Sequence, residues 1–127
     1  MPGYDTARFR PPAPVARVTL RDPESGTTTS NVPMLVDTGA DLTLIPLASI
    51  YGLGVLMEPD GYVLKSFDGT MSVAQAARIE LDLFGRTFKG RFLTVDQEWG
   101  LLGRDVLNNF VLVFDGPRLA WEQNQAG

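Results

Sequence analysis

The sequence predicts an all-β domain, either a sandwich or a barrel, with one or two short helices. Short apolar or alternating runs recur along the chain, and Gly, Pro, Asp or Asn separate them. Only two stretches suit a helical turn, and no segment repeats at the periods of solenoid proteins. The 127 residues, of which 44% are hydrophobic, suffice for one core and are too few for two ordinary domains.

The first predicted strand follows an N-terminal arm. Residues 1–14 hold four of the nine prolines, which lack the N–H that helices and sheets require. We therefore expect a flexible or extended arm without regular structure. The alternation over residues 15–20 predicts a half-buried strand. Residues 22–26 form a turn cluster, and residues 27–29 begin a β-prone return strand.

A polar turn between two apolar runs is the most distinctive local feature. Residues 32–36 and 42–45 are predicted strands, and Asp37-Thr38-Gly39-Ala40-Asp41 lies between them. Residues 47–51 then suit one helical turn, which ends where glycines follow.

The second half continues the pattern of short strands. A hairpin is predicted around Asp68-Gly69, because this dipeptide favours tight β-turns. Asp105 is expected to cap a short helix over residues 106–110 with its carboxylate. The remaining predicted strands cover residues 62–65, 71–83, 87–95, 101–103, 111–114 and 118–121. We expect the folded domain to span residues 15–122, with a tail over residues 123–127.

The composition excludes several kinds of chemistry. The chain has no cysteine and no histidine, so it has no thiol nucleophile, no disulfide, no Ser-His or Cys-His catalysis and no imidazole-bound metal. An enzyme of this composition must rely on its 15 carboxylates, 11 basic residues, hydroxyls and backbone amides. We expect no cofactor and no metal.

Charge and hydropathy limit the partners that we expect. The net charge is −4, and the only basic stretch is the first 21 residues, so a nucleic-acid partner is not expected. No run approaches the roughly 20 apolar residues that span a membrane. The N-terminus has no apolar run of the kind found in secretory signals, which favours a cytoplasmic location.

The polar turn has two interpretations. In an ordinary turn, Asp37 and Thr38 would hydrogen-bond their own backbone at the surface. Because buried runs lie on both sides, a functional site is an equally good interpretation. There, Gly39 would allow a ligand or a second chain to approach, and the Thr38 hydroxyl would brace the carboxylate.

Two motifs in order resemble those of retropepsin-like (retroviral-type) aspartic proteases. Residues 36–45 are similar to the active-site loop of that family, and Leu101-Leu102-Gly103-Arg104-Asp105 resembles the segment that opens its C-terminal helix. The hairpin over residues 65–71 lies where the family has its substrate-covering flap. The resemblance implies a single-lobe, retropepsin-like acid-protease barrel. The polar flap tip and the extra hairpin after the helix favour cellular or bacterial members over viral ones.

The resemblance also implies an aspartic endopeptidase that cleaves peptide or protein substrates. The chain has one Asp-Thr-Gly, whereas the chemistry needs two carboxylates, so Asp37 must meet its counterpart in a homodimer. Thr38 would lock the two loops, Gly39 would bind the substrate backbone, and Ala40 would line a pocket. Asp41 would face substrate and pair with Arg104, although for both residues we favour an ion pair that only fixes the loop over direct contact with substrate. From the flap, the expected substrate contacts are Phe67, Asp68 and Gly69.

The same sequence features also fit other functions. A non-catalytic retropepsin-like dimerisation or peptide-binding module would use the same groove without hydrolysis. A cation site built on Asp37 and Asp41 is disfavoured, because their spacing matches no calcium loop. The basic, proline-rich arm could be removable or could bind a partner near the dimer interface.

Overall fold

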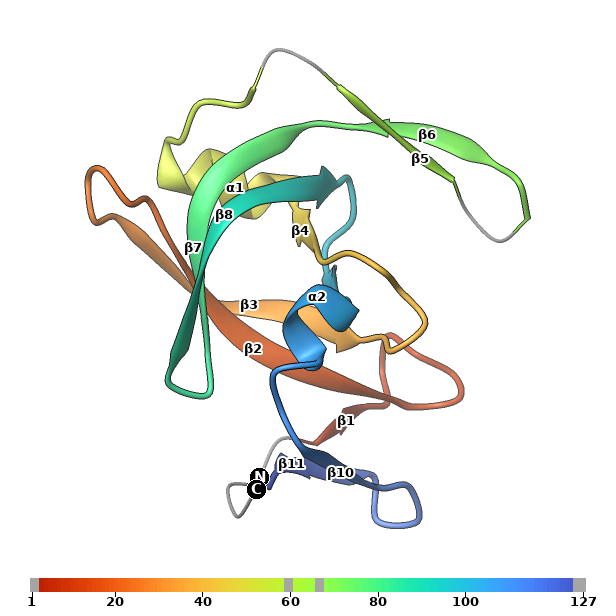
Figure 1. Cartoon of the computed structure of the whole chain (residues 1–127). Helices are drawn as coiled ribbons and strands as arrows, with labels where there is room; N and C mark the ends of the chain where they lie inside the picture. Colours follow the sequence, from red (N-terminus) through yellow and green to blue (C-terminus); the bar gives the residue numbers. More distant parts are fainter. Residues whose placement is uncertain (1–2, 59–60, 66–67, 125–127) are drawn as a thin grey trace.

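The computed structural model describes residues 3–58, 61–65 and 68–124. These residues form eleven strands and two short helices (Figure 1). The strands are β1 (Tyr4–Asp5), β2 (Ala13–Arg21), β3 (Thr28–Val36), β4 (Leu44–Pro46), β5 (Tyr62–Lys65), β6 (Met71–Ala74), β7 (Ala76–Leu83), β8 (Arg86–Val95), β9 (Gly100–Leu102), β10 (Leu112–Asp115) and β11 (Ala120–Gln123). The helices are α1 (Leu47–Leu53) and α2 (Arg104–Leu107).

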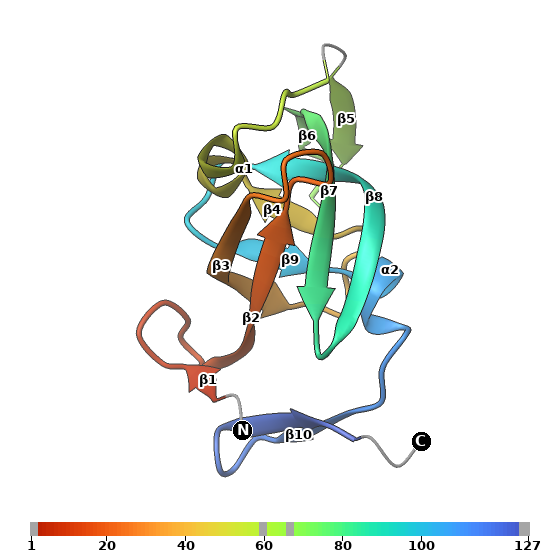
Figure 2. The ribbon, with the colours of Figure 1, turned by 90° about the vertical axis from the view of Figure 1, so that its left-hand side faces the viewer.

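Six strands close into a single barrel, which confirms the prediction of a mostly β, one-lobe fold. Their order is β2-β3-β9-β4-β8-β7, and β2 also pairs with β7, so the sheet closes on itself. The β3–β9 and β4–β8 pairs are parallel, and the other pairs are antiparallel. β1 adds a short strand beside β2. Figures 1 and 2 show the β5–β6 hairpin projecting at one end of the barrel and the β10–β11 hairpin lying at the other.

The interior is apolar because the barrel strands alternate. β7 buries every second side chain from Ala77 to Leu83, as the alternation in this segment predicts. Leu20, Met34, Ile45, Leu81 and Leu102 have no exposed surface, and α1 closes the core with Ile50 and Leu53. Neither helix within the described ranges has the length and apolar character needed to cross a membrane.

β3 is one continuous strand, although the sequence suggested two separate runs. The register between β2 and β3 shifts between Val18 and Leu20, which pair with Val32 and Thr29. β3 thus holds one extra residue, which is a β-bulge. Asn31 lies in it with φ of 59°, a conformation that asparagine tolerates better than most residues. The bulge keeps both halves of β3 in the same sheet.

The N-terminal segment contains regular structure that its prolines did not predict. Tyr4 pairs with Pro14 and Asp5 with Ala13, so β2 begins two residues earlier than expected. Proline is compatible with these positions because they lie where strands start and at the sheet edge. The expectation of an arm without regular structure is therefore wrong for β1 and for the start of β2.

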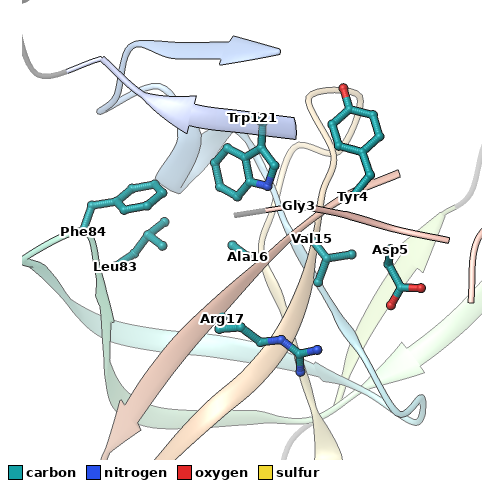
Figure 3. A pocket seen from close by; sticks show the side chains of 9 residues that line it. All are labelled: Gly3, Tyr4, Asp5, Val15, Ala16, Arg17, Leu83, Phe84 and Trp121. Atoms are coloured by element: carbon teal, nitrogen blue, oxygen red, sulfur yellow. The ribbon is translucent and has the colours of Figure 1, made fainter. Parts of the chain in front are cut away.

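The terminal hairpin attaches to the barrel through Trp121. This side chain is 1% exposed and packs edge-to-face on Phe84, whose ring centroid is 5.6 Å away. Phe84 and Gly85 form the two-residue turn between β7 and β8, with φ of 51° and 76°, as tight hairpins require. A cavity of about 430 Å³ lies between this junction and β1–β2 (Figure 3). Among the described residues, the Trp121 indole Nε1 has no hydrogen-bond partner.

Candidate active site

Asp37 directly follows β3, at the point where that strand runs beside β9. Its backbone N–H donates to the Leu102 carbonyl at 3.1 Å, which extends the parallel β3–β9 pairing by one bond. Because β9 lies between β3 and β4 in the sheet, the loop from Asp37 to Thr43 must cross the end of β9. The topology therefore fixes where the carboxylate stands.

The loop beyond Asp37 is a closed turn with its own hydrogen bonds. The Gly39 N–H donates to Asp37 Oδ1 at 3.0 Å, and the Ala40 N–H donates to the Asp37 carbonyl at 3.1 Å. These are the bonds of an Asx-type turn, so the ordinary-turn interpretation is correct as local geometry. The carboxylate is partly exposed and lines a groove, so this turn also presents it to a ligand.

Arg104, the first residue of α2, holds the other end of the loop. Its N–H donates to the Ala40 carbonyl at 2.9 Å, and its Nη1 donates to the Thr38 carbonyl at 2.8 Å. Its Nη2 forms an ion pair with Asp41. The Asp41 side chain is 84% exposed, so this pair orients the loop more than it stabilises the fold.

Thr43 and Asp105 form a second link between loop and helix. The Thr43 hydroxyl donates to Asp105 Oδ1 at 2.6 Å, and the Thr43 N–H donates to Oδ2 at 3.1 Å. The same hydroxyl accepts the Gly103 N–H at 3.0 Å. The expected role of Asp105 as a helix cap is therefore wrong. The helix begins at Arg104 without a side-chain cap, and Thr43 engages both oxygens of the carboxylate.

Two glycines give the loop the space it needs. A Cβ on Gly103 would lie 2.5 Å from the Leu42 carbonyl carbon, closer than real Cβ contacts. A Cβ on Gly39 would lie 3.2 Å from Asp37 Oδ1, which would press on the carboxylate. The motif glycines therefore allow close backbone approach at the site.

A groove of about 980 Å³ runs along this loop. The active-site loop, β4, β9, the end of β8 and the β5–β6 hairpin all contribute to its wall. Apolar side chains predominate, with a few charged groups among them, as is typical of ligand sites. The lining residues are Asp37, Gly39, Ala40, Asp41, Leu42, Leu44, Val63, Leu64, Lys65, Ala74, Thr94, Val95, Asp96, Gln97 and Leu101.

Comparisons with known proteins give structural matches only. No family model matches the chain, and no curated protein does. The EIAV protease complexed with the inhibitor HBY-793 is similar in structure, with a TM-score of 0.57 and 24% identity over 76% of this chain and 86% of that one. The simian foamy virus (mac) protease has a TM-score of 0.50 and 16% identity over 74% of this chain and 91% of that one. The chain has a retropepsin-like fold.

This retropepsin-like lobe brings some of the predicted site residues together. Asp37, Gly39, Ala40 and Asp41 line the groove, and Arg104 supports their loop from behind. Thr38 is exposed, and its carbonyl accepts the bond from Arg104. The two matched structures are viral proteases, and the prediction that this chain is closer to cellular or bacterial members stays a prediction.

The predicted flap of the retropepsin-like lobe is the β5–β6 hairpin, in which Tyr62 pairs with Ala74 and Lys65 with Met71. Asp68 and Gly69 are exposed in its turn, apart from the groove lining of the single chain, and their role as substrate contacts stays a prediction. Phe67, the third expected flap contact, lies outside the described residues. Hydrogen bonds from Thr70 lower the pKa of the Asp68 carboxyl below its ordinary value.

The base of this flap is tied to the barrel by residues that sequence reasoning missed. Arg91 of β8 pairs with Glu58 at 2.5 Å and lies over the Tyr62 ring, 5.0 Å from its centroid. The Tyr62 hydroxyl donates to Glu58 at 3.3 Å, and the Glu58 N–H donates to the Ala76 carbonyl at 2.8 Å. The Arg91 guanidinium lowers the pKa of the Glu58 carboxyl. No sequence spacing links residues 33 positions apart, so this cluster had no readable signal.

Across the described ranges, no group of three or more Asp or Glu side chains is arranged to hold a metal ion. Two of the groove carboxylates, Asp37 and Asp41, instead lie beside hydrogen-bond donors of the protein.

Proposed function

We propose that this retropepsin-like chain is an aspartic endopeptidase whose active site forms when two copies meet. The observation that carries the proposal is the placement of Asp37 in the groove on a turn fixed by β9 and Arg104. An Asp-Thr-Gly turn held in this way leaves its carboxylate partly exposed and able to act on a ligand.

The proposed chemistry needs two Asp37 carboxylates and one water between them. Two such charges within hydrogen-bond distance cannot both ionise cheaply, so the pair shares one proton. The ionised carboxylate takes a proton from the water as the oxygen attacks the scissile carbonyl carbon. The protonated carboxylate donates to the carbonyl oxygen, which gives a neutral tetrahedral diol. Proton transfer to the amide nitrogen then lets the C–N bond break and releases two peptides.

A second copy is needed because, among the described residues, one groove supplies a single carboxylate suited to this role. Asp41 is engaged by Arg104, and Asp96 lies beyond the end of β8 rather than on the Asp-Thr-Gly turn. The exposed Thr38 hydroxyl would then bond across the twofold axis. The segment from Val111 to Leu119 supports association, because it exposes four large apolar side chains of the kind that interfaces bury. These are Val111, Val113, Phe114 and Leu119.

The groove suits an extended peptide as substrate. Its apolar walls would take side chains, while exposed backbone at Gly39 would bond to the peptide backbone in the manner of an added strand. The structurally similar EIAV protease is complexed with an inhibitor, which supports a ligand in the corresponding groove here.

A peptide-binding module without hydrolysis is the second candidate. The exposed flap residues Asp68 and Gly69 favour it, since neither of them has an apolar side chain to close over a substrate.

The two candidates are separated by replacing Asp37 with Asn. We expect the wild-type chain to cleave members of a peptide library, and Asp37→Asn to lose at least about a thousandfold in rate because the dyad loses its base. Sedimentation of the same samples should show a dimer for both forms. Equal cleavage by both forms, or a wild-type protein that binds peptides without turnover between about pH 3 and 8, would overturn the endopeptidase proposal.

A further inference from the structure

We propose that Asp96 makes the groove select peptides with a basic side chain, at one position on each side of the cut bond. This inference rests on the proposed function, because it assumes that extended peptides occupy the groove. It names a substrate class that the groove's shape alone does not give.

The groove holds both acidic and basic side chains. Asp37, Asp41, Lys65 and Asp96 are its charged lining residues within the described part of the chain. Arg104 compensates Asp41, and two copies of Asp37 would share one proton in the dimer. Lys65 belongs to the flap strand β5 and makes no ion pair with Asp96. Asp96 is thus the uncompensated anion on the barrel side of the groove.

The Asp96 carboxylate is available to a ligand. Asp96 is exposed, and its side chain has no hydrogen-bond or ion-pair partner among the residues that the structure describes. An unpaired carboxylate that faces a partly apolar groove is complementary to a lysine or arginine side chain, whose apolar stem can lie along the wall.

Asp96 lies in a short loop that is anchored at both ends. It directly follows β8, whose last residue, Val95, pairs with Pro46 of β4. The loop then reaches Trp99, which packs edge-to-face on Phe9 with 4.9 Å between the ring centroids, and β9 begins at Gly100. Both ends of this short loop are anchored, so its charge has a defined place beside the bound peptide.

In a symmetric homodimer, Asp96 would create a preference for a basic side chain at two positions of the substrate. A homodimer with a twofold axis has one Asp96 on each side of that axis. The preference should therefore recur on both sides of the cleaved bond. A single-sided preference would not fit this origin.

The test uses matched peptides in which one position at a time is Lys, norleucine or Glu. Binding is measured on Asp37→Asn, which keeps the groove but cannot hydrolyse, and kcat/KM is measured on the wild-type protein. We expect Lys to be preferred over norleucine by roughly two- to fivefold at two positions, as for a partly exposed ion pair, and the preference to fall with salt.

Adding Asp96→Asn should abolish the preference, and Asp96→Lys should reverse it in favour of Glu. Glu98→Gln is the matched control, because Glu98 is exposed in the same loop and does not line the groove. Thermal melts establish that each variant is folded.

The outcomes separate the two proposals. Cleavage without a preference for Lys, retention of the preference in Asp96→Asn, or equal loss in Glu98→Gln overturns the role of Asp96 and leaves the endopeptidase intact. A preference in binding with no cleavage by the wild-type protein overturns the endopeptidase and supports Asp96. A protein that binds none of the peptides overturns both.

Discussion

Two glycines shape the active-site loop because they have no side chain. Gly103 lies directly against the Leu42 backbone of the loop, and Gly39 lies directly against the Asp37 carboxylate. The φ of Gly103 is −92°, which any residue can adopt, so its constraint is space rather than backbone conformation. The glycine that precedes Arg104 in the motif is therefore required because a side chain there would collide with the Leu42 backbone.

We predict that Gly103→Ala destabilises the chain by about 1–3 kcal/mol, because the new methyl group would press on the Leu42 backbone, which cannot rotate away as a side chain can. Urea unfolding midpoints measure this effect. Gly116→Ala is the control, since a Cβ there meets nothing within 4 Å. A shift of the same size in both variants would contradict the packing explanation.

Among the elements, the flap and the terminal hairpin depend on side-chain contacts far from their own turns. The β5–β6 hairpin forms a two-stranded sheet of its own, and the cluster of Glu58, Tyr62 and Arg91 ties its base to β8. The β10–β11 hairpin is also a separate sheet, and Trp121 anchors it on Phe84.

We predict that Glu58→Gln loosens the flap without unfolding the barrel. The substitution removes the charge that Arg91 pairs with, so hydrogen exchange should become several times faster in β5 and β6 and stay unchanged in β7. Glu24→Gln, which alters an exposed carboxylate in a distant turn, is the control. Unchanged exchange in β5 and β6 would show that the ion pair does not hold the flap.

For the terminal hairpin, we predict unequal costs for two substitutions at Trp121. Trp121→Ala should cost about 3–5 kcal/mol, because it leaves a cavity under β11. Trp121→Phe should cost less than half of that, since the lost indole Nε1 has no hydrogen-bond partner among the described residues. Thermal or urea unfolding compares the two. Equal losses of stability in the two variants would mean that the indole N–H makes a stabilising hydrogen bond.

The whole barrel depends on closure between β2 and β7. Arg21 pairs with Glu80 at 3.1 Å and also with Asp82, next to the backbone pairing that closes the sheet. The Thr87 hydroxyl donates to Asp82 at 2.6 Å. This hydrogen bond and the Arg21 guanidinium lower the pKa of the Asp82 carboxyl below its ordinary value of 3.8.

This shift predicts a loss of stability in acid. Because the folded-state pKa of Asp82 is lowered, its contribution is present above the ordinary value of 3.8 and is lost as the pH falls through the folded-state pKa. The difference in Tm between wild type and Asp82→Asn should therefore be largest above about pH 5 and should shrink below 3.8. A difference that does not vary with pH would contradict this role.

Sequence patterns predicted the barrel class, the flap hairpin and the terminal hairpin because each depends on local alternation and turn residues. They also placed Asp37 between two strands. They did not reveal that β9 lies between β3 and β4, nor that Thr43 engages Asp105, because both depend on contacts about sixty residues apart. The one sign of the Thr43–Asp105 contact in the sequence was the position of a threonine within the apolar run of residues 42–45.

The position of β9 also sets an order of events during synthesis and folding. β3 and β4 are close in sequence, yet the strand that separates them in the sheet begins only at Gly100. Contacts between such distant segments form late, because the intervening chain must first be brought together. The hydrogen bonds that join the Asp37 loop to Leu102 and Arg104 therefore cannot form on a nascent chain until the ribosome has added residues 100–105. In the proposed protease, these late contacts leave the active-site loop without its supports until the fold is nearly finished.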